Sequence, residues 1–248
     1  MPVPNQFLEI LRAPSFVVNL DTRPDRLAAT TEALRNAGFS DVRRFPAVDA
    51  RDQHRLERAW SACGSPPFAA WDSGFETVPG KQGCFLSHVA LWQEILDRNL
   101  PYACIFEDDV VFHRHWAQLA PTAFTFTPQD YDLLFMGSMI VTLGSGLVRR
   151  TPVYCMHAYL ITREGAARLR PLLLDDPEGV GSIDIMLYRQ QQLAEEQPGR
   201  RPFTWYAWSS TAFADARAHV YREWANRNTG LVFQDFEMGT DIGVARPD

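Results

Sequence analysis

The 248-residue sequence has few of the features that define several common classes of protein. It holds four cysteines, none in a C-x-x-C pair and three within apolar stretches, so we expect reduced thiols in the core rather than a disulfide framework. No run approaches the roughly 18 apolar residues that cross a bilayer. The first residues also lack the basic and apolar segments of a signal peptide. We therefore expect a cytoplasmic protein, whose contact with the inner face of a membrane would be peripheral.

Basic residues are outnumbered by acidic ones. The chain has 24 lysines and arginines against 30 aspartates and glutamates, a formal net charge of -6. Proteins dedicated to nucleic acids usually carry a basic surface, so this balance argues against a nucleic-acid partner. The hydrophobic share of 46% is enough for a large core, and the 22% share of charged residues excludes a disordered composition. The composition predicts a single domain over residues 1–248.

The first part of the chain predicts a β-α-β unit. Residues 15–20 (SFVVNL) are β-branched and aromatic, as in a short buried strand. A polar capping residue and Pro24 then begin a helix that Gly38 ends, and residues 42–48 form a second strand. Such a start is typical of a parallel sheet covered by helices.

The remainder continues as helices and strands. Residues 83–98 place large apolar side chains on one helical face, and residues 102–106 (YACIF) form an apolar strand of the kind found at the centre of a sheet. We further expect helices at 51–62, 163–174 and 182–193, strands at 132–136, 153–162 and 204–208, and a loop at 63–82. The predicted fold is an α/β protein with a mixed, mostly parallel sheet flanked by helices. The C-terminal residues show weak periodicity, and no element is assigned to them.

Three successive carboxylates, Glu107-Asp108-Asp109, follow the strand at 102–106 directly. Adjacent like charges raise one another's pKa, and Mg²⁺ or Mn²⁺, which prefer oxygen ligands, remove that cost. Alternation along an extended chain predicts that Glu107 and Asp109 point one way and Asp108 the other. A solvated acidic turn is the alternative, but apolar residues on both sides of the triplet favour a binding site.

Other polar side chains are expected at the same edge of the sheet. Asn19 and Asp21 follow the first strand, and Asp49 follows the second. Ligands of open α/β sheets bind beyond the carboxyl ends of the strands. The sequence therefore predicts one rim that collects these side chains and the acidic triplet.

Four segments in consistent order resemble glycosyltransferase family 25. They are Asn19-Leu20-Asp21 with Arg23-Pro24-Asp25-Arg26, Pro46-Ala47-Val48-Asp49, Gly83-Cys84-Phe85-Leu86-Ser87-His88, and Phe106-Glu107-Asp108-Asp109-Val110. The resemblance extends over residues 15–190. It implies a GT-A-type, Rossmann-like fold, a UDP-sugar donor, Mn²⁺ or Mg²⁺, and inversion at the anomeric carbon. It also divides the chain into a nucleotide-sugar part at 15–135 and an acceptor part at 136–248.

The resemblance also implies roles for individual residues. Glu107 and Asp109 hold the metal and Asp108 faces the sugar or ribose of the donor, or the two aspartates exchange these roles. The nucleotide pocket takes Asn19, Asp21, Arg23, Arg26 and Asp49, with Ser87 and His88 near the pyrophosphate or the donor sugar. For at least one of the two arginines, an ordinary solvated helix face is the alternative.

Inversion also requires a base for the acceptor hydroxyl. We favour Asp184, in the first turn of a helix after a Gly-containing turn, although charge complementarity at a helix N-terminus, worth about 0.3–1 kcal/mol, explains an aspartate there equally well. His157 is the second catalytic candidate, with a core histidine as its alternative. His113 and His115 are expected in a solvated loop, and Trp71 is the candidate for stacking on an acceptor sugar.

The predicted function is transfer of a hexose, galactose in the first instance, from a UDP-sugar to a hydroxyl of a surface glycan such as lipopolysaccharide or lipooligosaccharide. A protein or peptide acceptor is the alternative within the same class. A metal-dependent phosphohydrolase and a module that binds a nucleotide sugar without transferring it are the alternatives from other classes.

Overall fold

The computed structural model describes residues 5–64, 71–72, 74–140, 147–197, 199–200, 202–208, 228–235 and 238. Its helices are α1 (Asn5–Arg12), α2 (Pro24–Asn36), α3 (Gln53–Cys63), α4 (Pro79–Asp97), α5 (Trp116–Phe126), α6 (Arg163–Leu174) and α7 (Ile183–Glu196). Its strands are β1 (Ser15–Asn19), β2 (Val42–Pro46), β3 (Tyr102–Glu107), β4 (Val110–Phe112), β5 (Leu133–Ile140), β6 (Val148–Arg149), β7 (Val153–Thr162), β8 (Trp205–Trp208), β9 (Asn228–Gly230) and β10 (Val232–Gln234).

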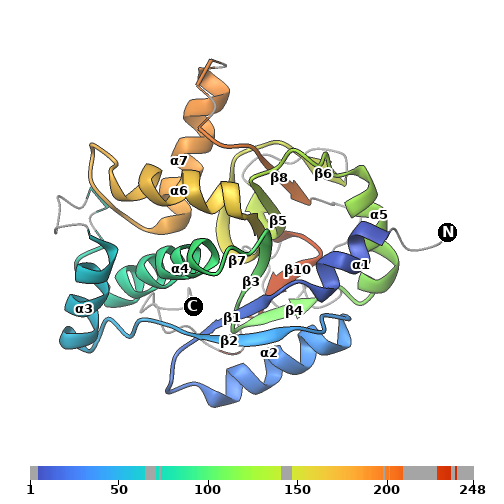
Figure 1. Cartoon of the computed structure of the whole chain (residues 1–248), viewed down its shortest axis with the longest axis horizontal. Coiled ribbons are helices and arrows are strands. Elements are labelled where there is room, and N and C mark those ends of the chain that lie inside the picture. Colours follow the sequence, from blue (N-terminus) through green and yellow to red (C-terminus); the bar gives the residue numbers. More distant parts are fainter. Residues whose placement is uncertain are drawn as a thin grey trace, which may run out of the picture.

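The main sheet is mixed, with the order β2-β1-β3-β7-β5-β8-β6 and with β9 paired to β5 (Figure 1). Strands β2, β1, β3, β5 and β8 run in one direction, because β1 is parallel to β2 and β3, β5 is parallel to β8, and β7 lies antiparallel between β3 and β5. Strands β6, β7 and β9 run the other way. The predicted mixed, mostly parallel sheet and its β-α-β start are therefore confirmed.

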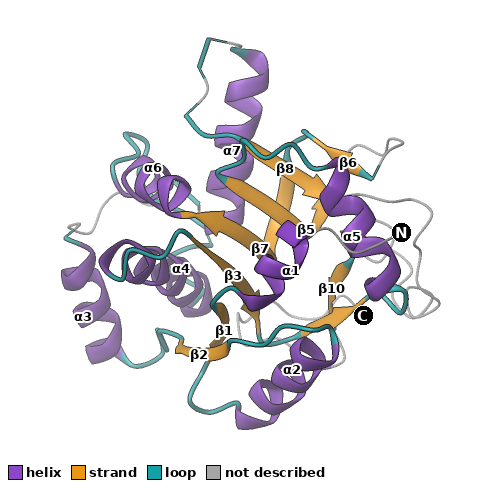
Figure 2. Cartoon of the chain, turned by 45° about the vertical axis from the view of Figure 1, so that its right-hand side comes forward, coloured by secondary structure: helices purple, strands orange, loops and turns teal. Residues whose placement is uncertain are grey.

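Alternate side chains of the central strands face opposite helical layers. Ile105 and Tyr159 belong to a core cluster with α3, α4, α6 and α7, whereas their neighbours Phe106 and Leu160 belong to a cluster with α1, α2 and α5. Figure 2 shows α4 and α6 on one side of the sheet and α1 and α5 on the other. The near-continuous apolar sequence of the central strands follows from burial on both faces.

Several elements lie where the sequence predicted none. They are α1, α5, β4, β6, β9 and β10. Pro121 inside α5 obscured its helical pattern, although Trp116, Ala120 and Phe124 all turn one face into the core. The expectation of a solvated loop at His113 was wrong, because that side chain is buried and its Nδ1 accepts a hydrogen bond from the His115 N–H (3.0 Å).

Gly137 and His157 seat the C-terminal strand β10 against the main sheet. A Cβ on Gly137 of β5 would lie 1.9 Å from the carbonyl oxygen of Val232 and 2.5 Å from Nε2 of His157. That same His157 nitrogen donates to the Val232 carbonyl at 3.0 Å. Strand β10 also pairs antiparallel with β4, which follows the acidic triplet. Strands β4 and β10 form a two-stranded sheet of their own, which places residues more than a hundred positions apart in the sequence beside one another.

We expect Gly137→Ala to lower the free energy of unfolding by about 1–3 kcal/mol, since the added methyl group overpacks the contact with Val232. Thermal or urea denaturation measures the change. Gly199→Ala is the matched control, because a Cβ there meets nothing within 4 Å. Equal effects of the two substitutions would contradict this account of how β10 is held.

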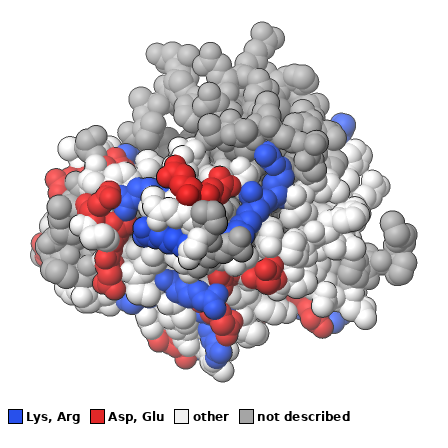
Figure 3. Space-filling model, turned by 90° about the horizontal axis from the view of Figure 1, so that it is seen from above, with Lys and Arg blue, Asp and Glu red and all other residues white. Residues whose placement is uncertain are grey.

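Charges on the described surface are largely paired. On the face seen in Figure 3, basic and acidic side chains lie beside one another, and no broad basic field covers the described part of it. Asp21, for example, contacts both Arg44 (2.5 Å) and Arg55 (2.8 Å). Among the described residues, no helix combines the length and the apolar character needed to cross a membrane.

Candidate active site

A pocket opens at the carboxyl ends of β1, β2 and β3. These strands are parallel neighbours, and their register places Asn19 beside Pro46 and Val18 beside Glu107. The pocket is lined by Val18, Leu20, Arg26, Ala47, Val48, Asp49, Ala50, Arg51, Gly80, Gly83, Cys84, Ser87, His88, Glu107, Asp108, Asp109 and Gln234. It lies where open α/β sheets bind their ligands.

Helix α4 forms one wall of the pocket through a close backbone contact. A Cβ on Gly83 would lie 2.4 Å from the carbonyl oxygen of Val48, so only glycine allows the helix to approach so near. One turn later, Ser87 accepts a hydrogen bond from the Val48 N–H (2.8 Å) and donates to the Gly83 carbonyl (2.5 Å). Gly83 and Ser87 therefore fix the start of α4 against the segment that carries Asp49.

The two aspartates of the triplet form the turn between β3 and β4, held from α2 and β1. The guanidinium of Arg26 bridges Asp108 (2.7 Å) and Asp109 (2.8 Å). Asn19 donates to the other oxygen of Asp108 (2.6 Å), and Thr30 donates to the Asp108 backbone carbonyl (2.7 Å). The alternation predicted for an extended triplet was wrong, because residues 108 and 109 adopt a turn in which both side chains reach Arg26.

Asp109 retains one carboxylate oxygen, Oδ1, that is buried and has no hydrogen-bond partner. Burial, followed by the charge of Glu107, raises the pKa of Asp109 from 3.8 to about 8. Buried polar atoms are nearly always paired, so an orphaned carboxylate oxygen in a pocket calls for an explanation. A proton or a metal ion on this oxygen satisfies it, and a divalent cation fits the donor set of Glu107 and Asp109.

Glu107 faces α4 and the C-terminal strand. One of its oxygens accepts a hydrogen bond from Nε2 of Gln234 (3.0 Å), and the other lies 3.8 Å from Nε2 of His88. Burial by itself would raise the pKa of Glu107, but His88 and then His157 lower it below its usual value. A lowered pKa favours the anionic form of Glu107, whose carboxylate lines the pocket.

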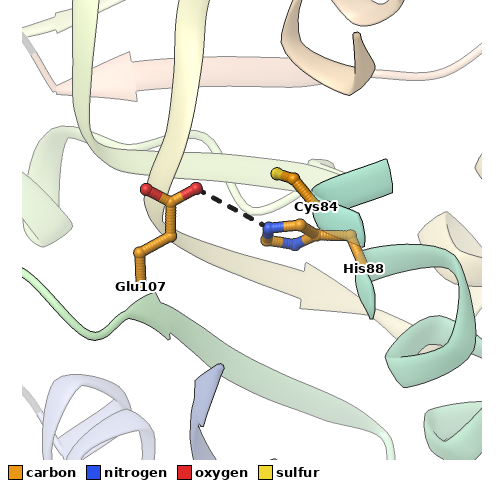
Figure 4. Close-up of side chains that lie close together, drawn as sticks. All are labelled: Cys84, His88 and Glu107. Carbon is orange, nitrogen blue, oxygen red and sulfur yellow. Dashed lines mark ion pairs between the residues drawn. The ribbon is translucent and has the colours of Figure 1, made fainter. Parts of the chain in front are cut away.

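His88 is oriented by aromatic side chains behind it. Its Nδ1 lies 2.7 Å from the hydroxyl of Tyr159, which also accepts a hydrogen bond from the Trp92 indole (3.0 Å). The remaining nitrogen, Nε2, points at Glu107, and Cys84 lies one helical turn before His88 on the same wall (Figure 4). The donor atoms of Cys84, His88 and Glu107 all lie within 4.8 Å of one another.

Asp184 lies in the first turn of α7, in the same helical layer as α4 and outside the residues that line the pocket. Its Oδ1 accepts from the Ile185 N–H (3.0 Å), and the Cys155 N–H also donates to the carboxylate. Burial raises the pKa of Asp184, and the charge of Glu107 adds to the rise. One turn later, Tyr188 stacks on Tyr154 of β7, with ring centroids 3.8 Å apart. Asp184 is thus close enough to feel the charge of Glu107, and it lies one helical turn before an aromatic pair.

The structure brings most of the predicted site residues together. Those that line the pocket are Arg26, Asp49, Ser87, His88, Glu107, Asp108 and Asp109, with Asn19 bonded directly to Asp108. Asp21 and Arg23 do not line it: Asp21 pairs with Arg44 and Arg55, and Arg23 contacts Asp25 (3.0 Å) and the Met238 carbonyl (3.2 Å).

Two other candidate side chains have structural partners. His157 is fully buried, burial lowers its pKa, and its Nε2 donates to the Val232 carbonyl, so this side chain holds β10. The indole of Trp71 donates to the Gly179 carbonyl (3.1 Å), and the Arg189 guanidinium lies over its ring.

Sequence reasoning missed several pocket residues, among them Gln234 and Cys84. No sequence pattern pointed to Gln234, because this side chain reaches Glu107 only through the pairing of β10 with β4. Cys84 was interpreted as a core thiol, although its spacing of four residues from His88 places both on one helical face. The expectation of reduced cysteines was correct, since Cys63, Cys84, Cys104 and Cys155 are all free thiols.

A family model described as "Glycosyltransferase family 25 (LPS biosynthesis protein)" matches residues 12–137, slightly more than half of the chain. Curated relatives include mouse (Mus musculus) "Procollagen galactosyltransferase 2", 26% identical over 167 residues, and Xenopus laevis "Procollagen galactosyltransferase 1-A", 31% identical over 170 residues. Another is the "Probable inactive glycosyltransferase 25 family member 3" of Bos taurus, 34% identical over 166 residues. Each match covers 62% of this chain but only 27–28% of the relative, so the chain spans little more than a quarter of these proteins.

A solved structure described as a "glycosyltransferase involved in the glycosylation of the major capsid of PBCV-1" also matches. It aligns with 92% of this chain and 93% of its own, with 9% sequence identity and a TM-score of 0.39.

Proposed function

Because the chain belongs to glycosyltransferase family 25, we propose that it transfers a hexose, galactose in the first instance, from a UDP-sugar to an acceptor hydroxyl with inversion. The observation that carries this proposal is the pocket at the ends of β1, β2 and β3, which is lined both by Glu107 and by Asp109 with its orphaned oxygen. Anionic oxygen ligands in a cleft fit a divalent cation bound together with a diphosphate.

In this proposal Glu107 and Asp109 hold Mn²⁺ or Mg²⁺. Such a cation acts as a Lewis acid that neutralises the charge developing on the departing diphosphate. Asp108 has a different task, because both of its oxygens already bind protein groups, Arg26 and Asn19. Asp108 and Arg26 therefore hold the acidic turn in place, and the ion pair with Arg26 limits repulsion between the two aspartates.

The donor nucleotide lies along the pocket wall formed by Asp49 and the first turn of α4. No side chain caps the N-terminal N–H groups of α4, and Gly80 lines the pocket, so this helix end presents donors to phosphate oxygens. Asp49 pairs through both oxygens with the exposed guanidinium of Arg51, and it offers its carboxylate to a ribose hydroxyl by exchanging part of that ion pair. His88 and Ser87 shape the wall rather than ligate phosphate, since each is buried and already hydrogen-bonded.

Asp184 is the base in the transfer step. The acceptor oxygen forms a bond to the anomeric carbon, the bond from that carbon to the diphosphate oxygen breaks, the acceptor proton passes to Asp184, and UDP leaves with the bonding electron pair. A carboxylate of raised pKa holds that proton better than an ordinary one. The stacked pair Tyr154 and Tyr188 offers a flat surface for the acceptor sugar beside this base, in place of Trp71.

The acceptor we favour is a surface glycan such as lipopolysaccharide, in line with the description of the family. A hydroxyl on a protein is the second candidate, favoured by the names of two relatives as procollagen galactosyltransferases. Residues 15–135 would bind the donor and residues 136–248 the acceptor, since Asp184, Tyr154 and Tyr188 all lie in the latter part.

A donor screen tests this function. We expect the purified chain to release UDP from UDP-galactose faster than from UDP-glucose or UDP-N-acetylglucosamine, and only when Mn²⁺ or Mg²⁺ is present. A coupled assay for UDP, with EDTA as the metal-free control, measures the rates. Release of phosphate instead of UDP would indicate the phosphohydrolase alternative. Tight binding of UDP-galactose without turnover on any glycan or peptide acceptor would indicate a binding module.

A further inference from the structure

We propose that Cys84, His88 and Glu107 form a binding site for Zn²⁺. This site differs from the Glu107–Asp109 pair in the residues that bind the metal. The proposal concerns a thiophilic metal, whereas the metal of the transfer reaction is one that prefers oxygen. Only one ligand, Glu107, is common to the two sets. Occupation by Zn²⁺ is a property of the pocket itself and needs no donor sugar.

The three donor atoms are already close to the spacing of a zinc site. They lie within 4.8 Å of one another, and the imidazole Nε2 of His88 is 3.8 Å from the nearer oxygen of Glu107. In a tetrahedral site with zinc bonds of roughly 2.0–2.3 Å, ligand atoms are about 3.3–3.8 Å apart. Small rotations of the Cys84 and Glu107 side chains therefore suffice to close the site.

The surroundings fix the ligands as metal sites require. Cys84 and His88 are four residues apart on α4, a long helix whose inner face is buried, so their relative position is set by the backbone (Figure 4). Tyr159 engages the Nδ1 of His88, and Trp92 in turn binds Tyr159. Outer partners of this kind orient a histidine and leave its other nitrogen for the metal.

The donor types select Zn²⁺ over Mg²⁺ or Mn²⁺. Thiolate and imidazole are ligands of zinc, whereas the hard cations prefer carboxylate and phosphate oxygens. Three protein ligands leave the fourth position open, and all three residues line the pocket, which provides the path of entry. Binding exchanges the thiol proton of Cys84 for the metal and releases that proton to water.

Because Glu107 belongs to both sets of ligands, Zn²⁺ should affect the transfer reaction, an expectation that rests on the proposed function. Glu107 cannot serve both metal sets at once, so Zn²⁺ at Cys84 and His88 withdraws a ligand from the cation of the donor complex. Zinc is then an inhibitor of transfer that Mn²⁺ relieves. The binding test below uses neither donor nor acceptor, so its failure and the failure of the proposed function are distinguishable.

Cobalt substitution tests the site directly, because Co²⁺ bound to thiolate gives a charge-transfer band in the near ultraviolet. We expect this band on titrating the metal-free protein with Co²⁺ and its loss on adding Zn²⁺. Cys84→Ser should abolish the band, while Cys63→Ser, which alters a free thiol at the end of α3, should retain it.

The affinity of the protein for Zn²⁺ is the second measurement. We expect Cys84→Ser and His88→Gln each to weaken Zn²⁺ binding by at least about 100-fold in competition with a chromophoric chelator. Circular dichroism establishes that each variant is folded, and His88→Gln replaces Cys84→Ser as the test if the latter is not. Absence of the band in the wild type, its survival in Cys84→Ser, or unchanged Zn²⁺ affinity in the folded variants would overturn the proposal.

Discussion

Asp109→Asn is expected to lower transfer by at least roughly 100-fold and to remove metal-dependent binding of UDP, while the protein stays folded. The reason is that asparagine keeps the shape of the side chain but replaces the buried Oδ1, which has no hydrogen-bond partner, with a weak ligand. Arg26 keeps its ion pair with Asp108, so the turn retains its anchor. Initial rates with UDP-galactose and Mn²⁺ measure the loss.

Asp109→Asn should raise the stability of the metal-free protein at alkaline pH, whereas a substitution that merely damages the fold would lower it. In the metal-free protein the folded state raises the pKa of Asp109 from 3.8 to about 8, so between these values the folded chain holds a proton that the unfolded chain has released. This group therefore costs stability as pH rises from about 4 to 8. Asp109→Asn cannot titrate, and we expect it to unfold at a higher temperature than the wild type at pH 8 without metal.

Asp97→Asn is the matched control for the same chemical change. Asp97 is exposed at the end of α4, where it accepts a hydrogen bond from Gln93 (2.7 Å). Its replacement should leave both transfer and UDP binding unaltered. Full activity of a folded Asp109→Asn protein would remove Asp109 from the metal site.

Asp184→Asn is expected to lower turnover by about 10²–10⁴-fold, the usual contribution of a positioned general base. The affinity for UDP should change little, because the side chain lies on α7 and does not line the donor pocket. Its hydrogen bond from Ile185 can be kept by the amide oxygen, so α7 should remain in place. Steady-state kinetics with a glycan acceptor, paired with UDP titration, separate the two effects.

The pH profile gives an independent check on the same residue. Burial raises the pKa of Asp184, and the rate should fall as pH drops through that raised value because the base becomes protonated. Asp175→Asn, an exposed change just beyond α6, should leave both the rate and the profile as they are. A wild-type rate in Asp184→Asn would assign proton removal to another group.

The central strands and the rim of the site could be predicted because their signals are local. The apolar run at 102–106 and the first strand, Ser15–Asn19, are buried on both faces, which leaves a pattern in neighbouring residues. The carboxyl ends of parallel strands then meet at one edge, and this rule alone collected Asn19, Asp49 and the acidic triplet.

The remaining features depend on contacts between distant segments. Gln234 reaches Glu107 only because β10 pairs with β4, and β10 is seated by Gly137 and His157 on other strands. The backbone turn at Asp108 redirects its side chain to Arg26, which no spacing rule for strands anticipates. Periodicity reports which face of an element is buried, but not which partner covers it.

Calorimetric titration of UDP into the metal-free protein, with and without Mn²⁺, tests the central claim most directly. With Mn²⁺ we expect saturable binding that depends on Asp109 and is lost in Asp109→Asn. Without metal we expect little or no heat of binding from either protein. Binding of UDP with equal affinity in the presence of EDTA, or equal Mn²⁺-dependent binding by Asp109→Asn, would contradict the assignment of metal and diphosphate to the acidic turn.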